Sequence, residues 1–142
     1  MLANSLTWRD GELQRGRGVE RMALKRMVME LGMGTDLQGE DYTKAACRAV
    51  HNALRQNSLH VYDAFGVSRD DMVVEILIGV AQPDKVDVDA VSKMLPYGSR
   101  TVKVEAGGMD TPKDSGGVTV MANAAIIVFL DLPEGKAWGA AA

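Results

Sequence analysis

The segment Met27–Arg55, MVMELGMGTDLQGEDYTKAACRAVHNALR, joins a short apolar run to a regularly patterned helix. Met27–Leu31 is predicted to form a strand, which Gly32-Met33-Gly34 is predicted to end. From 41 to 55 the apolar residues recur every three or four positions, which is the period of an amphipathic helix. The segment therefore predicts a strand, a glycine-containing loop over Gly32–Gly39, and a helix.

The predicted helix has two different sides. Asp41 is expected to cap its N-terminus and Asn57-Ser58 to end it. The apolar side is mostly alanine, which allows close packing on a sheet, and the opposite side is basic, as a solvated helix surface often is. The apolar side consists of Tyr42, Ala45, Ala46, Ala49, Val50 and Ala53, and the basic stripe consists of Lys44, Arg48, His51 and Arg55.

Further elements follow along the chain. Met72–Val80 and Val118–Leu130 are rich in β-branched and aliphatic residues, and Thr101–Ala106 alternates apolar with polar residues, so all three are predicted strands. Asp87–Leu95 is predicted to be a short helix, and Thr111–Gly117 a polar loop. The order β-α-β-α-β-β predicts an α+β fold: a two-layer α/β sandwich with a mixed sheet and both helices on one face.

The sheet face away from the helices is predicted to be too apolar for a solvated surface, which favours self-association into a homo-oligomer. Glu75, Lys103 and Asn123 interrupt the same strands. They are expected either to pair across neighbouring strands or to line a polar pocket at a subunit boundary. The apolar candidates for this face are Val73, Leu77, Met121, Ala125, Ile127 and Phe129.

The chain has 142 residues, the size of one domain. Residues 23–133 carry the regular patterns and are predicted to form that domain. Residues 1–22 intersperse glycine with arginine and are predicted to be a flexible, dispensable N-terminal tail. Residues 134–142 are predicted to be a C-terminal tail of small residues.

Composition argues against several classes of protein. A net charge of −3 provides no basic field for nucleic acid, and no apolar run has the length of a membrane span. Cys47 is the only cysteine, which excludes an internal disulfide, and the chain has too few histidines to complete a metal site. We therefore expect a cytoplasmic protein with no metal, no cofactor and no nucleic-acid or membrane partner.

Gly32–Gly39 is the strongest candidate for a binding site. Glycines before a helix N-terminus let the backbone turn, with Gly34 expected at positive φ, and they present N–H groups to an anion. Glu40 stands where a Walker loop has lysine, and the glycine spacing does not match the dinucleotide-binding fingerprint. The alternative is a tight structural connection between strand and helix.

Two charged residues are expected to serve this loop, Asp36 with a carboxylate and Lys44 with a cation or base. Lys44 falls in the first helical turn, where a cation opposes the helix dipole. We therefore expect Asp36, Glu40 or a ligand anion to hold it. Asn123 and Gly107-Gly108 are expected to complete the pocket from the last strands.

The pattern Gly32-x-Gly34-x-Asp36-x-x-Gly39 resembles the GxGxDxHG motif of a family of conserved hypothetical proteins named after a Listeria "Lin" locus. The resemblance extends over about residues 25–131. Gln38 stands where the family has histidine, which puts in doubt any role of that position as a base or metal ligand. The other matching blocks are Asp41–Val50, Asn57-Ser58, Gly107-Gly108-Met109 and Met121–Ala125.

The predicted order of elements is also similar to chorismate-mutase-like modules and to the ring-opening amidohydrolases cyanuric acid hydrolase and barbiturase. Those proteins build sites between copies of such a unit, so the analogy implies a homo-oligomer that is a trimer. Fold analogy alone does not assign a function.

Two functions fit these observations. The first is an oligomeric small-molecule-binding protein or enzyme that acts on a small polar or anionic metabolite through the Gly32–Gly39 loop. The second is a non-catalytic oligomeric module, in which the same residues only shape the fold and the subunit contact. For the first, the candidate catalytic residues are Asp36 and Lys44, and the candidate ligand-binding residues are Gly32, Gly34, Gln38, Gly39, Gly107, Gly108 and Asn123.

Overall fold

The computed structural model describes residues 7–9, 12–14, 22–56 and 60–134. A mixed sheet of five strands forms one layer, in the order β3-β7-β4-β5, with β6 also paired to β7. β4 and β5 are parallel, and β7 is antiparallel to each of its neighbours. The strands are β3 (Met22–Asp36), β4 (Val73–Val80), β5 (Ser99–Ala106), β6 (Met109–Pro112) and β7 (Val118–Pro133).

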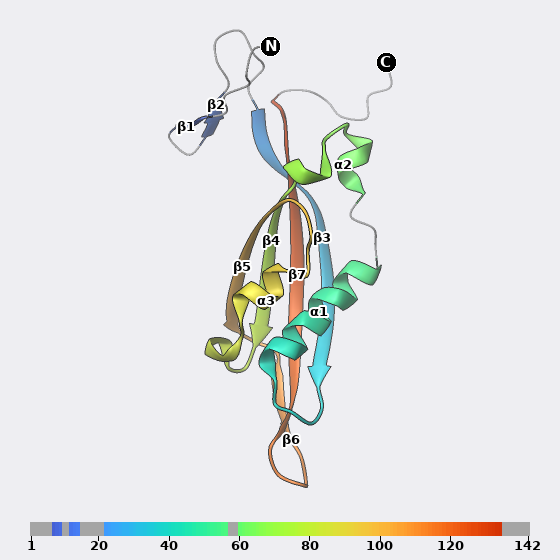
Figure 1. The fold of residues 1–142 in the computed structure, drawn as a ribbon, viewed down its shortest axis with the longest axis vertical. Coiled ribbons are helices and arrows are strands. Elements are labelled where there is room, and N and C mark those ends of the chain that lie inside the picture. Colours follow the sequence, from blue (N-terminus) through green and yellow to red (C-terminus); the bar gives the residue numbers. More distant parts are fainter. Residues whose placement is uncertain (1–6, 10–11, 15–21, 57–59, 135–142) are drawn as a thin grey trace.

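The second layer is helical and covers one face of the sheet, as the sequence predicts (Figure 1). The long helix α1 (Tyr42–Gln56) crosses β3 and β7, and the short helix α3 (Val88–Ser92) lies beside it against β5. Asp87 caps α3 by accepting hydrogen bonds from two backbone N–H groups. Three short elements that were not predicted join the layers: α2 (Val61–Ala64) and the 3₁₀ turns η1 (Arg69–Asp71) and η2 (Pro83–Lys85).

The core lies between α1, α3 and the sheet. Along β4 every second residue is buried, because strand side chains alternate between the two faces. These residues belong to the same hydrophobic core as the alanine side of α1, which is fully buried and packs mainly on β3 and β7. The predicted amphipathic helix and its apolar side are therefore confirmed. These core residues are Val74, Ile76, Ile78 and Val80 on β4 and Ala45, Ala46, Ala49 and Ala53 on α1.

The first strand is longer than predicted, since β3 continues through Gly32 and Gly34 to Asp36. The predicted strand break is wrong. A Cβ atom on Gly32 would lie 2.2 Å from the backbone oxygen of Ala49, and one on Gly34 would lie 2.3 Å from the Ala49 nitrogen. Neither glycine has positive φ. They are glycine because α1 packs directly onto the strand backbone, and not because the chain turns there.

The end of the sheet also differs from the prediction. Part of the predicted polar loop Thr111–Gly117 belongs to β6, and the turn itself is closed by Lys113 N–H donating to Gly117 O at 3.0 Å. Gly107 and Gly108 carry the chain across the end of β4, so that β6 replaces β4 beside β7. Gly108 has a φ of 58°, and a Cβ there would lie 2.2 Å from the Met121 oxygen.

The other face of the sheet has no helix on it in the described part of the chain (Figure 1). β-strand register places the predicted residues of this second face together, since Glu75 pairs with Ile127, Leu77 with Ala125, and Val73 with Phe129. From β3, this open face also receives Met29, Leu31 and Met33, which the sequence analysis did not assign to it.

The predicted tails are described only in part. Within residues 1–22 the structure places a short antiparallel hairpin, β1 (Thr7–Arg9) and β2 (Glu12–Gln14). Residues 135–142 and the predicted helix end at Asn57-Ser58 lie outside the described residues. No helix among the described residues has the length and apolar character needed to cross a membrane.

Candidate functional site

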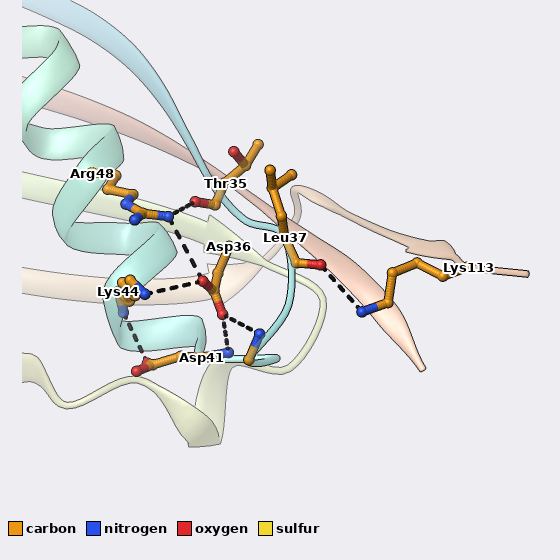
Figure 2. A network of polar contacts seen from close by, with 8 residues as sticks. Thr35, Asp36, Leu37, Asp41, Lys44, Arg48 and Lys113 are labelled. Carbon is orange, nitrogen blue, oxygen red and sulfur yellow. Dashed lines mark hydrogen bonds and ion pairs between the residues drawn. The ribbon is translucent and has the colours of Figure 1, made fainter. Parts of the chain in front are cut away.

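Asp36 is the centre of a polar network at the end of β3 (Figure 2). The residue is only 3% exposed. Its Oδ2 atom accepts the backbone N–H groups of Asp41 at 2.9 Å and Gly39 at 3.1 Å. Its Oδ1 atom lies 3.5 Å from Nζ of Lys44. One side chain therefore holds the loop that connects β3 to α1 and also pairs with the first turn of the helix.

Arg48 adds a second cation to this network. Its guanidinium donates to the backbone oxygen of Thr35 at 2.7 Å and lies 3.7 Å from Oδ1 of Asp36. The backbone N–H of Asp41 lowers the pKa of Asp36 most strongly, and Lys44 and the N–H of Gly39 lower it further, although burial opposes them. The carboxyl of Asp36 is therefore ionised at neutral pH.

Three further groups of the loop are also paired. Asp41 accepts the N–H of Lys44 at 2.9 Å, as the predicted N-cap. Glu40 has a φ of 51°, and its side chain accepts the N–H of Val118 at 2.7 Å. Lys113 donates to the oxygen of Leu37 at 3.1 Å. The loop is therefore fixed to the β6–β7 turn by side chains from both partners.

These contacts decide what the loop can do chemically. An anion site at a helix N-terminus needs free backbone N–H groups. Here the N–H groups of Gly39, Asp41 and Lys44 already donate to carboxylates of the chain itself. Asp36 occupies the position that an external anion would take. Of the partners expected for Lys44, which were Asp36, Glu40 and a ligand anion, the structure shows Asp36.

The other predicted site residues do not join this network. Gly32 and Gly34 lie beneath α1, and Gln38 is exposed. Asn123 pairs in register with Met33 and lies on the open face, whereas Asp36 lies on the helical side, so the sheet separates them. Gly107-Gly108 forms the crossing from β5 to β6. The single pocket expected from Asp36, Lys44, Gly107-Gly108 and Asn123 is therefore not formed.

A second polar cluster was missed by sequence reasoning. The hydroxyl of buried Tyr42 is hydrogen-bonded to Oδ2 of Asp110 and accepts from Gln82 at 2.9 Å. Lys85 lies over the tyrosine ring, 5.4 Å from its centroid. Burial and the Asp110 carboxylate raise the pKa of Tyr42 to about 12. The only signal was a tyrosine on an otherwise small apolar helix face, and nothing nearby in the sequence indicated its partners.

Two shallow hollows meet at Leu31 and Asn123. One, of about 220 Å³, lies on the open face, and the other, of about 530 Å³, reaches over β3 to Asn52 of α1. In the smaller hollow the small residues Gly79 and Ala125 leave space, and Asn123 and Glu105 provide polar groups. Nearby, Lys103 pairs with Glu75 at 3.0 Å across β4 and β5, which is the expected ion pair between neighbouring strands. Among the described residues, no three His, Cys, Asp or Glu side chains gather as metal ligands.

Comparison with known proteins gives a family and several similar chains among the solved structures. The family model described as "Conserved hypothetical protein (Lin0512_fam)" matches residues 26–128. One of these chains is an FtsZ-like protein of unknown function from Nostoc punctiforme, which is 36% identical with a TM-score of 0.71. The match covers 78% of this chain and 99% of that one. No curated protein matches the chain.

Proposed function

We propose that this chain, which belongs to the Lin0512_fam family of conserved hypothetical proteins, is a non-catalytic module that self-associates through the open face of its sheet. The observation that carries the proposal is a row of large apolar side chains on β3. Met29, Leu31 and Met33 are 48%, 57% and 55% exposed. All three lie on the face that no described helix covers.

The row continues across the sheet. Ala125 on β7 pairs directly with Leu31, and Leu77 on β4 lies beyond Ala125. Ile127, which pairs with Met29, is only 7% exposed and is already buried within the single chain. A contiguous apolar surface of this kind is typical of an interface, because burying it removes apolar area from water at about 25 cal/mol per Å². The ion pair of Glu75 with Lys103 provides a polar border.

The arrangement around Asp36 favours a non-catalytic module over a catalytic function. A general acid or base needs a protonation site that a substrate can reach. Asp36 is buried and its two oxygens face two backbone N–H groups and two cations. Lys44 is half-exposed, but it is paired with that same carboxylate. The network therefore supports a structural role for the residues predicted as catalytic.

A second candidate function is binding of a small polar molecule against Asn123. The specific support is an exposed amide in an apolar hollow bordered by Leu31 and Gly79. Glu105 also lines this hollow, and such a combination of a few polar groups with apolar walls is usual for ligand sites. A second copy packed on the open face would enclose this hollow, so the two candidates are compatible.

Sedimentation velocity over the micromolar range tests the main proposal. The wild-type chain is expected to associate, and Leu31→Lys is expected to weaken association by placing a charge in the interface. Val88→Lys is the matched control, since Val88 is 45% exposed but lies on α3, in the helical layer. A wild-type protein that stays monomeric, or a Leu31→Lys protein that associates like the control, contradicts the proposal.

Native mass spectrometry of the purified protein tests the second candidate. A small molecule retained by the wild type and lost from Asn123→Ala supports ligand binding in the hollow. Retention by Asn123→Ala, or no retained molecule in the wild type after incubation with a metabolite extract, contradicts it.

A further inference from the structure

We propose that the outer edge of β5 pairs with β5 of a second copy, antiparallel about a two-fold axis at Val104, with Lys103 opposite Glu105 of the other copy. This contact is separate from the open face and goes beyond the function proposed above. It is made by backbone hydrogen bonds along a strand edge. The argument rests on which edge is free, which backbone groups it presents, and how its charges are arranged.

The two long outer strands of the sheet, β3 and β5, differ in how their edges are covered. On β3, the side chain of Asn52 accepts the N–H of Met33 at 3.0 Å, and Arg48 donates to the oxygen of Thr35 at 2.7 Å. These two helix residues occupy backbone groups that another strand would need. Proteins often protect edge strands in such ways.

β5 has no comparable cover within the described part of the chain. All of its residues from Ser99 to Ala106 are exposed or half-buried. Its one neighbour in the sheet is β4. Arg100 donates its side chain to the oxygen of Leu95, and no side chain among the described residues bonds the outward backbone of β5. The edge is eight residues long and contains no proline.

The hydrogen bonds to β4 show which groups of β5 point outward. Ser99 N–H donates to the oxygen of Met72, and Gly107 N–H donates to the oxygen of Val80. Along a strand of a parallel ladder, the backbone groups of successive residues point alternately to the two sides of the strand. The N–H and C=O groups of the odd-numbered residues of β5 therefore point toward β4. The even-numbered residues therefore present their N–H and C=O groups to a new strand. They are Arg100, Val102, Val104 and Ala106.

A two-fold axis at Val104 satisfies this geometry, because it pairs Val104 with Val104 of the second copy and Val102 with Ala106 of the second copy. In both pairs the backbone N–H and C=O groups point outward from β5 and can form hydrogen bonds with the other chain. Lys103 and Glu105 then form two symmetric non-hydrogen-bonded pairs, in which side chains approach most closely. On the helical side, Val104 meets Val104 and extends the apolar layer.

The other registers are worse. An axis at Lys103 places two lysines directly opposite, and an axis at Glu105 places two glutamates opposite, which is destabilising. An axis at Val102 sets Lys103 against uncharged Thr101. The charges of β5 therefore select one register, as a self-complementary two-fold interface requires.

Within one chain, Lys103 already pairs with Glu75, whereas Glu105 has no ion pair among the described residues. Glu75 first, and Glu105 more weakly, raise the pKa of Lys103 and keep it a cation. In the dimer each Lys103 would stand between Glu75 of its own chain and Glu105 of the other. Because the axis is perpendicular to the sheet, both open faces would lie on one side of a continuous sheet.

Charge exchange tests the register. Glu105→Lys and Lys103→Glu each place like charges opposite, so each alone is expected to raise the dimer dissociation constant about tenfold or more. Mixing the two variants restores both ion pairs, so a mixed dimer should form. The double variant should associate like the wild type. Asp114→Lys, in the exposed β6–β7 turn, makes the same change of net charge as Glu105→Lys and should have no effect.

A backbone variant tests the edge independently of charge. Ala106→Pro removes one outward N–H and leaves the ladder to β4 intact, so it should weaken the dimer, whereas Ala106→Ser should not. Thermal melting verifies that each variant folds. If Lys103→Glu does not fold, Glu105→Lys and Ala106→Pro carry the test. Association that is unchanged in both, or no mixed dimer from two folded charge variants, overturns the inference.

Leu31→Lys separates this inference from the proposed function. If Leu31→Lys dissociates the protein and the β5 variants do not, the open face is the interface and the edge contact is wrong. If only the β5 variants dissociate it, the edge contact holds and the proposed open-face interface is wrong. A wild-type chain that remains monomeric contradicts both.

Discussion

Lys44 places its ammonium 3.5 Å from a carboxylate oxygen of Asp36, a half-exposed cation against a buried anion. The pair joins the last residue of β3 to the first turn of α1. Asp36 makes more contacts that hold the loop than Lys44 does, because it also accepts hydrogen bonds from two backbone N–H groups of the connecting loop. Substitutions of the two residues should therefore have unequal effects.

Asp36→Asn is expected to destabilise the protein by about 1–3 kcal/mol, the cost of leaving buried groups without a partner. An asparagine can accept only through one oxygen, and its NH₂ group would face either backbone donors or cations. Urea unfolding measures the loss. Asp114→Asn, in an exposed turn, is the control. An Asp36→Asn protein as stable as that control would show that the loop does not depend on this carboxylate.

The stability contributed by Asp36 should depend on pH. Its pKa is lowered in the folded state, chiefly by the N–H of Asp41. A lowered carboxyl pKa contributes stability above the unfolded value of about 3.9, and this contribution is lost as the pH falls through the folded value. The wild type should therefore lose its advantage over Asp36→Asn in acid. A stability difference that stays constant from neutral pH to strong acid would contradict this assignment.

Lys44→Met is expected to change stability by no more than about 1 kcal/mol, since a partly exposed ion pair contributes little. Arg48 remains beside Asp36 in this variant. Thermal melting of Lys44→Met and Asp36→Asn in parallel provides the comparison. A larger loss in Lys44→Met than in Asp36→Asn would reverse the proposed order of importance.

Gly34→Ala should destabilise the fold by about 1–3 kcal/mol or more through overpacking. The added Cβ would lie 2.3 Å from the Ala49 nitrogen and 2.4 Å from the Ala45 oxygen, so α1 must move away from β3. Gly79→Ala is the matched control, because its Cβ would meet nothing closer than 3.5 Å. Equal melting temperatures for the two variants would contradict the close helix–strand contact.

Tyr42→Phe is expected to cost about 1–3 kcal/mol, because it removes a buried hydroxyl from Asp110 and Gln82. In the folded wild type the pKa of Tyr42 is about 12, raised mainly by burial. The neutral phenol therefore stabilises the fold fully below the unfolded value of about 10, and this contribution is lost as pH rises toward 12. A phenolate absorbance titration should show this late step in the wild type only.

Much of the architecture could be predicted from period and composition. The alternation in Thr101–Ala106, the β-branched run in Met72–Val80 and the alanine side of the helix over 41–55 each report burial on a defined face. Those patterns gave the mixed sheet and the placement of both helices. The family follows from the separated sequence blocks, and the match over 26–128 confirms it.

The glycines show where local interpretation fails. Considered locally, Gly32 and Gly34 predict the end of a strand, because glycine usually marks a turn. Their spacing of two puts both on one strand face, and the facing helix is lined with alanine, so the two patterns together indicate close packing. Tyr42 and Asp110 illustrate a different limit, since they are 68 residues apart and only the folded sheet brings them together.

The central position of β7 sets the order in which this domain can be completed. β3 is the first strand of the five-stranded sheet in chain order, and among the described strands its only neighbour in that sheet is β7, the last. Their register begins at Met22 with Pro133, a separation spanning nearly the whole domain. During synthesis, β3 and β4 therefore lack the strand that lies between them until β7 has left the ribosome. Such distant pairing predicts slow, all-or-none folding and a period in which unpaired strands need protection from aggregation.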